Sequence, residues 1–207
     1  YEIGVRLVGS EMCIRDSAGA VRDVRLSLTP QLRTDVDSVL VAIDLGNGQN
    51  RMGGSILSQV TQQFGQTTPD MEDAGKLKDF VKLVRKLTLA GCVLSYHDRA
   101  DGGLLATVAE MMFAGHCGVN LTLDSMVASA KTADVIAPLF NEELGAVLQV
   151  RADRVDDVVA AVKHAGLSHC AHFIGEVTQE QTLVISAHGE TLYEGRRATL
   201  QKAWTQV

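Results

Sequence analysis

Short apolar runs alternate with amphipathic stretches along most of the chain. The apolar runs have the length of buried strands and lie at 38–45, 92–97, 119–123 and 146–151. The amphipathic stretches have helical spacing and lie at 55–64, 71–90, 103–114, 133–140 and 153–165. Alternation of this kind predicts an α/β fold in which helices pack on a sheet.

The helix predicted over 71–90 has apolar residues three or four positions apart, which defines one face. These residues are Leu77, Phe80, Val81, Val84 and Leu87. From the same periodicity we expect four valines of different helices to be fully buried, namely Val84, Val108, Val158 and Val162.

The last part of the chain is rich in β-type pattern. Short strands are expected at 173–178, 182–185 and 191–193, and a polar helix from about Arg197. Because this segment follows alternating strands and helices, we expect an α/β sandwich with a mixed sheet.

Composition narrows the possible functions. Of the 207 residues, 46% are hydrophobic and 21% charged, an ordinary composition for a soluble globular protein. The formal net charge of −6, without a basic run, argues against nucleic acid as a partner. No apolar stretch approaches the roughly 18 residues needed to cross a bilayer, so a membrane partner is not expected either.

The first 17 residues lack periodicity, and we interpret 1–17 as a non-native segment that packs poorly on the rest. Charged residues at Glu2, Arg6 and Glu11 exclude a signal peptide. The four cysteines contain no C-x-x-C pair and lie at positions 13, 92, 117 and 170. Buried free thiols in a reducing cytoplasm are the expected state, and a thiol nucleophile is the alternative.

The densest chemistry lies at 96–104, where two carboxylates, an imidazole, a guanidinium and two glycines share one turn. A strand precedes this turn and a helix follows it, so unpaired helix N–H groups can face a phosphate. Carboxylates tolerate a phosphate when a divalent cation lies between them. The local pattern therefore indicates Mg²⁺–nucleotide binding, with Asp98 as the first candidate ligand. An exposed turn residue or a helix cap is the alternative for Asp98.

Neighbouring residues leave alternatives open. Asp101 is expected to cap the following helix rather than to bind metal. Arg99 can reach a phosphate or pair with Asp98. His97 fits a packed, hydrogen-bonded histidine better than a general base.

A second glycine-rich loop spans 46–55 and fits neither the Walker nor the Rossmann spacing. It is either a structural tight turn or a phosphate contact. The segment Asn141-Glu142-Glu143 follows a short predicted helix, and its pattern alone suggests a solvated cap.

Four blocks in chain order, at 28–32, 45–55, 95–118 and 140–147, resemble phosphoribosylformylglycinamidine synthase in its large single-chain form. The resemblance implies ATP- and glutamine-dependent amidation of formylglycinamide ribonucleotide in purine biosynthesis, in the cytoplasm. It also implies a three-layer sandwich, the C-terminal subdomain of an aminoimidazole-ribonucleotide-synthetase-like module. Residues 38–207 would form this subdomain and 18–37 would lead in from an upstream one.

The resemblance assigns Asp98 as a Mg²⁺ ligand at an auxiliary ATP or ADP site, with Arg99, Ala100, Gly102 and Gly103 near the nucleotide. Ala100 departs from the family, in which serine is common, and this weakens the expected contact. No catalytic residue is assigned to the chain itself. The implied partners are a nucleotide, a sister module and a glutaminase domain of the same polypeptide. A purely structural docking subdomain and another ATP-dependent enzyme of the superfamily are the alternatives.

Overall fold

The structure is a computed structural model that describes residue 21 and residues 23–206. The interpretation of 1–17 as a poorly packed segment therefore lies outside the described residues. Within the described part, seven strands form one sheet in the order β2-β4-β1-β5-β3-β6-β7. They are β1 (Ser38–Asp44), β2 (Val93–Asp98), β3 (Gly118–Thr122), β4 (Gly145–Arg151), β5 (Ala171–Thr178), β6 (Thr182–Ala187) and β7 (Glu190–Arg196). All neighbours are antiparallel except β3 and β6, so the expected mixed sheet is confirmed.

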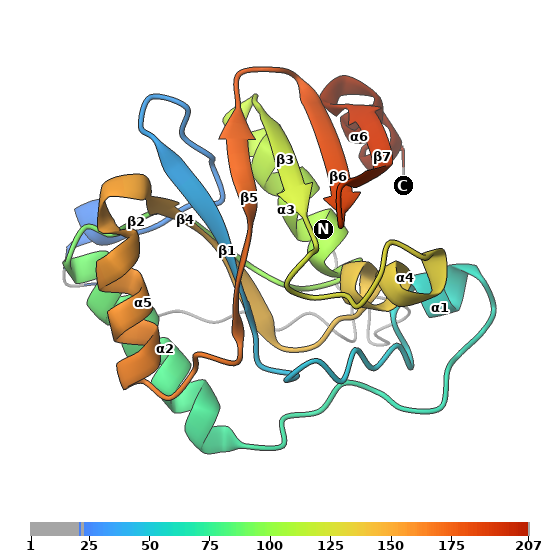
Figure 1. The fold of residues 1–207 in the computed structure, drawn as a ribbon, viewed down its shortest axis with the longest axis horizontal. Coiled ribbons are helices and arrows are strands. Elements are labelled where there is room, and N and C mark those ends of the chain that lie inside the picture. The colour runs from blue at the N-terminus through green and yellow to red at the C-terminus, as the bar shows by residue number, and fades with distance from the viewer. Residues whose placement is uncertain (1–20, 22, 207) are drawn as a thin grey trace, which may run out of the picture.

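Six α-helices and two short 3₁₀ turns complete the described part. The helices are α1 (Ile56–Val60), α2 (Ala74–Leu89), α3 (Gly103–Gly115), α4 (Thr132–Phe140), α5 (Val155–His164) and α6 (Arg197–Trp204). The 3₁₀ turns are Val24–Leu26 and Ala152–Arg154. Figure 1 shows α2 and α5 together beside the β2–β4–β1 end of the sheet, and α3, α4 and α6 toward the β7 end.

Side-chain alternation along β1 separates two cores. Leu40 and Ala42 join a cluster that includes residues of α3 and α4. Val41 and Ile43 point to the other face and join residues of α2 and α5. Helices thus cover both faces of the sheet, which confirms the three-layer α/β sandwich.

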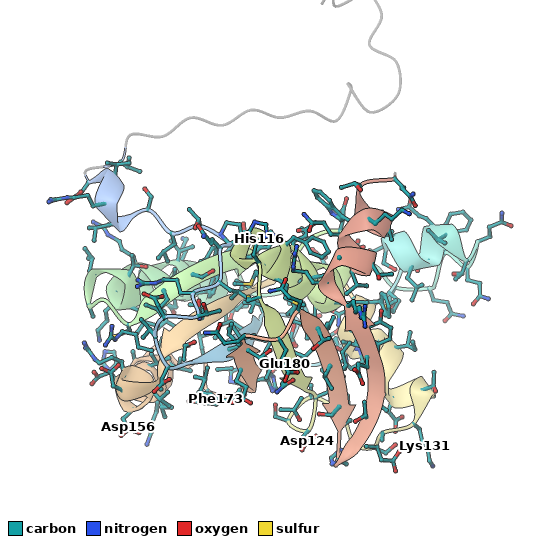
Figure 2. All side chains as sticks on the ribbon, turned by 90° about the horizontal axis from the view of Figure 1, so that it is seen from above. His116, Asp124, Lys131, Asp156, Phe173 and Glu180 are labelled. Carbon is teal, nitrogen blue, oxygen red and sulfur yellow. The ribbon has the colours of Figure 1, made fainter. Side chains whose placement is uncertain are left out.

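The second face is only partly covered by its helices. Phe173 of β5 is 42% exposed beside α5. Figure 2 shows it on the same side of the molecule as Asp156 of α5, away from His116 at the end of α3. An isolated exposed aromatic of this kind is common on protein surfaces.

The segment before β1 closes the outer edge of β2. The Thr29 carbonyl accepts hydrogen bonds from the Tyr96 N–H at 3.0 Å and from the Ser95 hydroxyl at 2.9 Å. The Gln149 side chain, fully buried in β4, bonds both backbone groups of Arg33. Irregular chain therefore supplies an acceptor for the Tyr96 N–H on the outer edge of β2.

Two expectations about helix packing were wrong. On α2 the buried residues are Phe80, Leu83 and Leu87, while Val81 is 57% exposed and Val84 is half-buried. Leu77 and Val84 are only partly buried against the core cluster that contains Phe80, Leu83 and Leu87, so the buried stripe is narrower than predicted. The full burial expected of Val108, Val158 and Val162 is confirmed.

Candidate functional site

Three chain segments meet at one end of the β2–β4–β1 part of the sheet. β1 ends at Asp44 opposite Gly145, and β2 ends at Asp98 opposite Ala146. Because β4 runs antiparallel to both strands, its beginning lies between their ends. The 46–55 loop, the 98–103 loop and residues 141–145 are thereby brought together, and we take this cluster as the candidate site.

Arg99 forms a buried ion pair beneath the site. Its guanidinium lies 2.5 Å from the Asp44 carboxylate, and both side chains are 3% exposed. The same guanidinium donates to the backbone carbonyls of Glu143 at 2.6 Å and Leu144 at 3.2 Å. Of the two alternatives for Arg99, pairing with Asp98 is wrong because its partner is Asp44, whereas contact with a phosphate stays a prediction. Asp44 was missed because it ends an apolar run without any motif of its own.

Asp98 lies at the end of β2 and is exposed, as expected. Its carboxylate accepts a hydrogen bond from the Tyr96 hydroxyl. Burial, and then this hydrogen bond, raise the pKa of Tyr96 above its usual value. Tyr96 therefore orients the Asp98 carboxylate, and no sequence motif pointed to this role.

His97 points to the opposite side of β2 and is partly buried. Its Nε2 lies 2.7 Å from the Glu110 carboxylate, which also accepts from the Trp204 indole at 3.0 Å. The interpretation of His97 as a packed, hydrogen-bonded residue is confirmed.

The predicted cap of α3 by Asp101 is wrong. The N-cap is Gly102, with φ of 81°, and no side chain caps the helix from that position. Asp101 and Ala100 are exposed. The Gly102 N–H donates to Glu142 at 2.9 Å and the Gly103 N–H to the Ala100 carbonyl at 3.0 Å. Both groups expected to face a phosphate thus have partners within the chain.

Gly103 is required by close backbone packing. It has φ of 69°, and a Cβ there would lie 2.7 Å from backbone atoms of residues 139–141. Any other residue would be strained and would collide with rigid neighbours. The start of α3 is therefore pressed directly against the end of α4.

Residues 141–143 hold the 46–55 loop. Asn141 donates to the Asn50 side chain at 3.0 Å, and Glu142 accepts from the Ile56 N–H at 2.8 Å. The Glu143 carboxylate binds the Arg51 guanidinium through two contacts, at 2.6 and 2.8 Å. Asn141 and Glu143 are 0% and 1% exposed, so their interpretation as a solvated cap is wrong. The hydrogen bond to Glu143 raises the pKa of Arg51 above its usual value.

Two glycines of the 46–55 loop serve packing. A Cβ on Gly46 would lie 2.6 Å from the Glu143 side chain, and one on Gly53 would lie 2.4 Å from the Thr67 carbonyl oxygen. These close contacts favour a structural tight turn as the role of the loop over contact with a phosphate.

The cysteines of the described chain are buried and free, at positions 92, 117 and 170. Burial raises the pKa of Cys117 to about 11 and also raises the pKa of Cys170. A raised pKa lowers the thiolate fraction, which disfavours the alternative of a thiol nucleophile at these two positions.

An apolar cavity of about 330 Å³ lies elsewhere, among α3, α4, α6 and the last two strands. Its lining includes Leu105, Leu139 and Leu192 and has no charged residue. Charged side chains make the strongest hydrogen bonds to a phosphate, and this lining offers none. The cavity therefore does not compete with the loop cluster as a nucleotide site.

The fit of the site to Mg²⁺ rests on one side chain. Among residues 21 and 23–206, no group of three or more His, Cys, Asp and Glu residues is arranged to hold a metal ion. Asp98 is an exposed, oriented carboxylate, a ligand type that Mg²⁺ prefers. It fits as one ligand of a site completed by other groups. In the same described part, no helix has the length and apolar character needed to span a membrane.

Comparison with known proteins identifies the family. Residues 36–188 match the family described as AIR synthase related protein, C-terminal domain. The chain belongs to this family. The match covers β1 to β6 and includes the whole loop cluster.

Solved structures share the fold of this AIR-synthase-related domain. PurL of T. maritima complexed with ATP is 15% identical, with a TM-score of 0.66 over 86% of this chain and 27% of that one. PurLQS from Thermotoga maritima is also 15% identical, with a TM-score of 0.64 over 84% and 27%. E. coli HypE, a hydrogenase maturation protein, is 21% identical, with a TM-score of 0.56 over 80% and 51%. The chain thus spans about a quarter of the PurL chains and about half of HypE.

Proposed function

We propose that this domain belongs to a phosphoribosylformylglycinamidine synthase and contributes to an auxiliary Mg²⁺–nucleotide site. That enzyme amidates formylglycinamide ribonucleotide, consuming ATP and glutamine. The observation that carries the proposal is the exposed carboxylate of Asp98 at the end of β2, oriented by the Tyr96 hydroxyl. The structural likeness to T. maritima PurL complexed with ATP and with ADP supports a nucleotide as the ligand.

In this proposal Asp98 supplies one ligand to Mg²⁺, and the remaining ligands come from other parts of the polypeptide. When bound, the ion neutralises phosphate charge that would otherwise be repelled by Asp98. Ala100 offers only backbone groups to the nucleotide. The absence of a hydroxyl there removes at most one hydrogen bond, worth about 0.5–1.5 kcal/mol. The domain carries no catalytic residue, and its contribution is to hold the nucleotide.

The proposal is tested by Asp98→Asn in the full-length enzyme. The substitution keeps the side-chain shape but removes the charge that would hold Mg²⁺. We expect less co-purified ADP and a lower melting temperature with Mg²⁺ present, because a ligand of the native state stabilises it. We expect a smaller effect on turnover.

Asp101→Asn is the matched control, since it removes an exposed carboxylate three residues away. ADP content and melting are measured for both variants, purified without added nucleotide. Equal ADP and equal melting for Asp98→Asn and the wild type would contradict the assignment of Asp98. Lost turnover with full ADP retention would instead place Asp98 in the catalytic machinery.

A structural docking role is the second candidate. It is favoured by the internal partners of Arg99, Gly102 and Gly103, which leave fewer groups for a nucleotide. The complete reading frame discriminates between the two. A downstream glutaminase with Cys, His and Glu would support the synthase, whereas a stop codon near Val207 would favour docking.

A further inference from the structure

One carboxylate oxygen connects the two glycine-containing loops. Glu142 Oε1 accepts hydrogen bonds from the Ile56 N–H at 2.8 Å and from the Gly102 N–H at 2.9 Å. Ile56 begins α1 directly after the 46–55 loop, and Gly102 is the N-cap of α3 in the 98–103 loop. The two donors are 46 positions apart in the chain but share one acceptor atom.

Both donors belong to groups that a helix cannot satisfy internally. The first N–H groups of a helix have no partner within it. Ser55 caps α1 only through the Ser58 N–H, and no side chain at the N-cap serves α3. Loss of the Glu142 carboxylate would therefore leave two backbone donors without their acceptor.

The backbone around Glu142 is fixed on both sides. Asn141 is fully buried and bonds the Ala137 carbonyl at 2.8 Å, while its own oxygen accepts from the Glu143 N–H at 3.2 Å. Glu143 is anchored by Arg51. Because its neighbours are held in this way, Glu142 has little freedom to follow one loop and abandon the other.

We propose that Glu142 is a positioning residue that couples the 46–55 and 98–103 loops. Its carboxylate holds the start of α1 and the start of α3 in one arrangement. Ordering of either loop is then transmitted to the other through the shared oxygen. The extension to nucleotide binding rests on the proposed function, whereas the coupling itself does not.

The coupling is tested by amide hydrogen exchange of the ligand-free 207-residue chain, resolved at Ile56 and Gly102. In Glu142→Ala we expect both amides to exchange about tenfold faster or more, since hydrogen bonds to charged acceptors are the stronger ones. Glu142→Gln keeps an acceptor oxygen and should restore most of the protection. Unchanged exchange, or a change at only one of the two amides, would overturn the proposal.

Glu72→Ala is the matched control. Glu72 touches only the outer side of the 46–55 loop, through Gln49 and Arg51. Its removal should leave Gly102 unchanged. If Glu142→Ala does not fold, as judged by its melting transition, Glu142→Asp replaces it, because the shorter side chain cannot reach both donors. Wild-type exchange at both amides in this variant would equally overturn the coupling.

A second measurement adds Mg²⁺ and ADP to the full-length enzyme, because the remaining ligands of the proposed site lie in other parts of the polypeptide. In the wild type we expect slower exchange in both loops, and in the Glu142 variant only in the 98–103 loop. Slowing in both loops of the variant would overturn the coupling. No slowing in either loop of the wild type would contradict the proposed nucleotide site while the ligand-free result still decides the role of Glu142.

Discussion

The 46–55 and 98–103 loops each connect a strand of the same sheet to a helix, yet they are built differently. In the 46–55 loop, Arg51 is clamped by a fully buried carboxylate, and two glycines lie where no Cβ would fit. In the 98–103 loop, Arg99 and Gly103 are buried and support the fold. Asp98, Ala100 and Asp101 of the same loop are exposed. The same strand–loop–helix order thus gives one loop whose Arg51 supports the fold and one loop that exposes two carboxylates to solvent.

The difference shows that glycine-rich composition does not by itself indicate ligand contact. What separates the loops is where their polar groups find partners. In the 46–55 loop, the side chains of Asn50 and Arg51 are bonded to the buried Asn141 and Glu143. The exposed carboxylate of Asp98 in the other loop remains accessible to a ligand. Substitutions in the two loops should therefore act on different properties.

The largest effect is expected from Glu143→Ala. This change leaves Arg51 without its main partner, and removing one member of a buried pair costs about 3–5 kcal/mol. We expect a loss toward the lower figure in urea unfolding, because Arg51 keeps Glu72. Glu72→Ala, which removes an exposed partner, should cost below about 1 kcal/mol. Equal losses in the two variants would contradict the buried clamp.

A smaller loss is expected from Gly53→Ala. The new Cβ would approach the Thr67 carbonyl oxygen at 2.4 Å, so the backbone must shift, at a cost of about 1–3 kcal/mol. Gly48→Ala is the comparison, because its surroundings are open and only its φ of 72° is unfavourable. Thermal melting should show the greater decrease for Gly53→Ala. The reverse order would mean that the 46–55 loop is not held by close packing.

The smallest effect is expected from Asp101→Ala in the other loop. Its side chain is exposed and does not cap α3. Surface changes of this kind usually stay within about 0.5 kcal/mol. Chemical denaturation should therefore give nearly the wild-type free energy of unfolding. A loss above about 1 kcal/mol would restore Asp101 as a helix cap.

The sequence predicted the elements well and their junctions poorly. The periodicity and length of the apolar runs identified nearly every strand and helix, since burial of apolar faces decides those elements locally. The narrow stripe of α2 was not predictable, because which residues meet α5 depends on the relative placement of two helices. Val158 belongs to the buried cluster between the sheet and these helices, whereas Val84 is only partly buried against it.

At the candidate site, the sequence pattern identified the exposed Asp98 but not the buried residues that hold the neighbouring loops in place. Asp98 was found from a local strand–loop–helix pattern. Asp44, Glu142 and Glu143 form hydrogen bonds with partners 40 to 92 positions away in the chain. No local sequence pattern indicates contacts between residues so far apart. The partner of Arg99 was missed for the same reason: Asp44 is near in space but 55 positions away in the chain.

The irregular segment beside β2 has a practical consequence for producing this domain. A fragment begun at the family boundary, residue 36, would remove Thr29 and Arg33. The Tyr96 N–H would then lie on an open strand edge, and the buried Gln149 amide would lose both of its backbone partners. Open edges recruit strands from other molecules. An expressed fragment that begins upstream of residue 28 should stay monodisperse, while one that begins at residue 36 should aggregate.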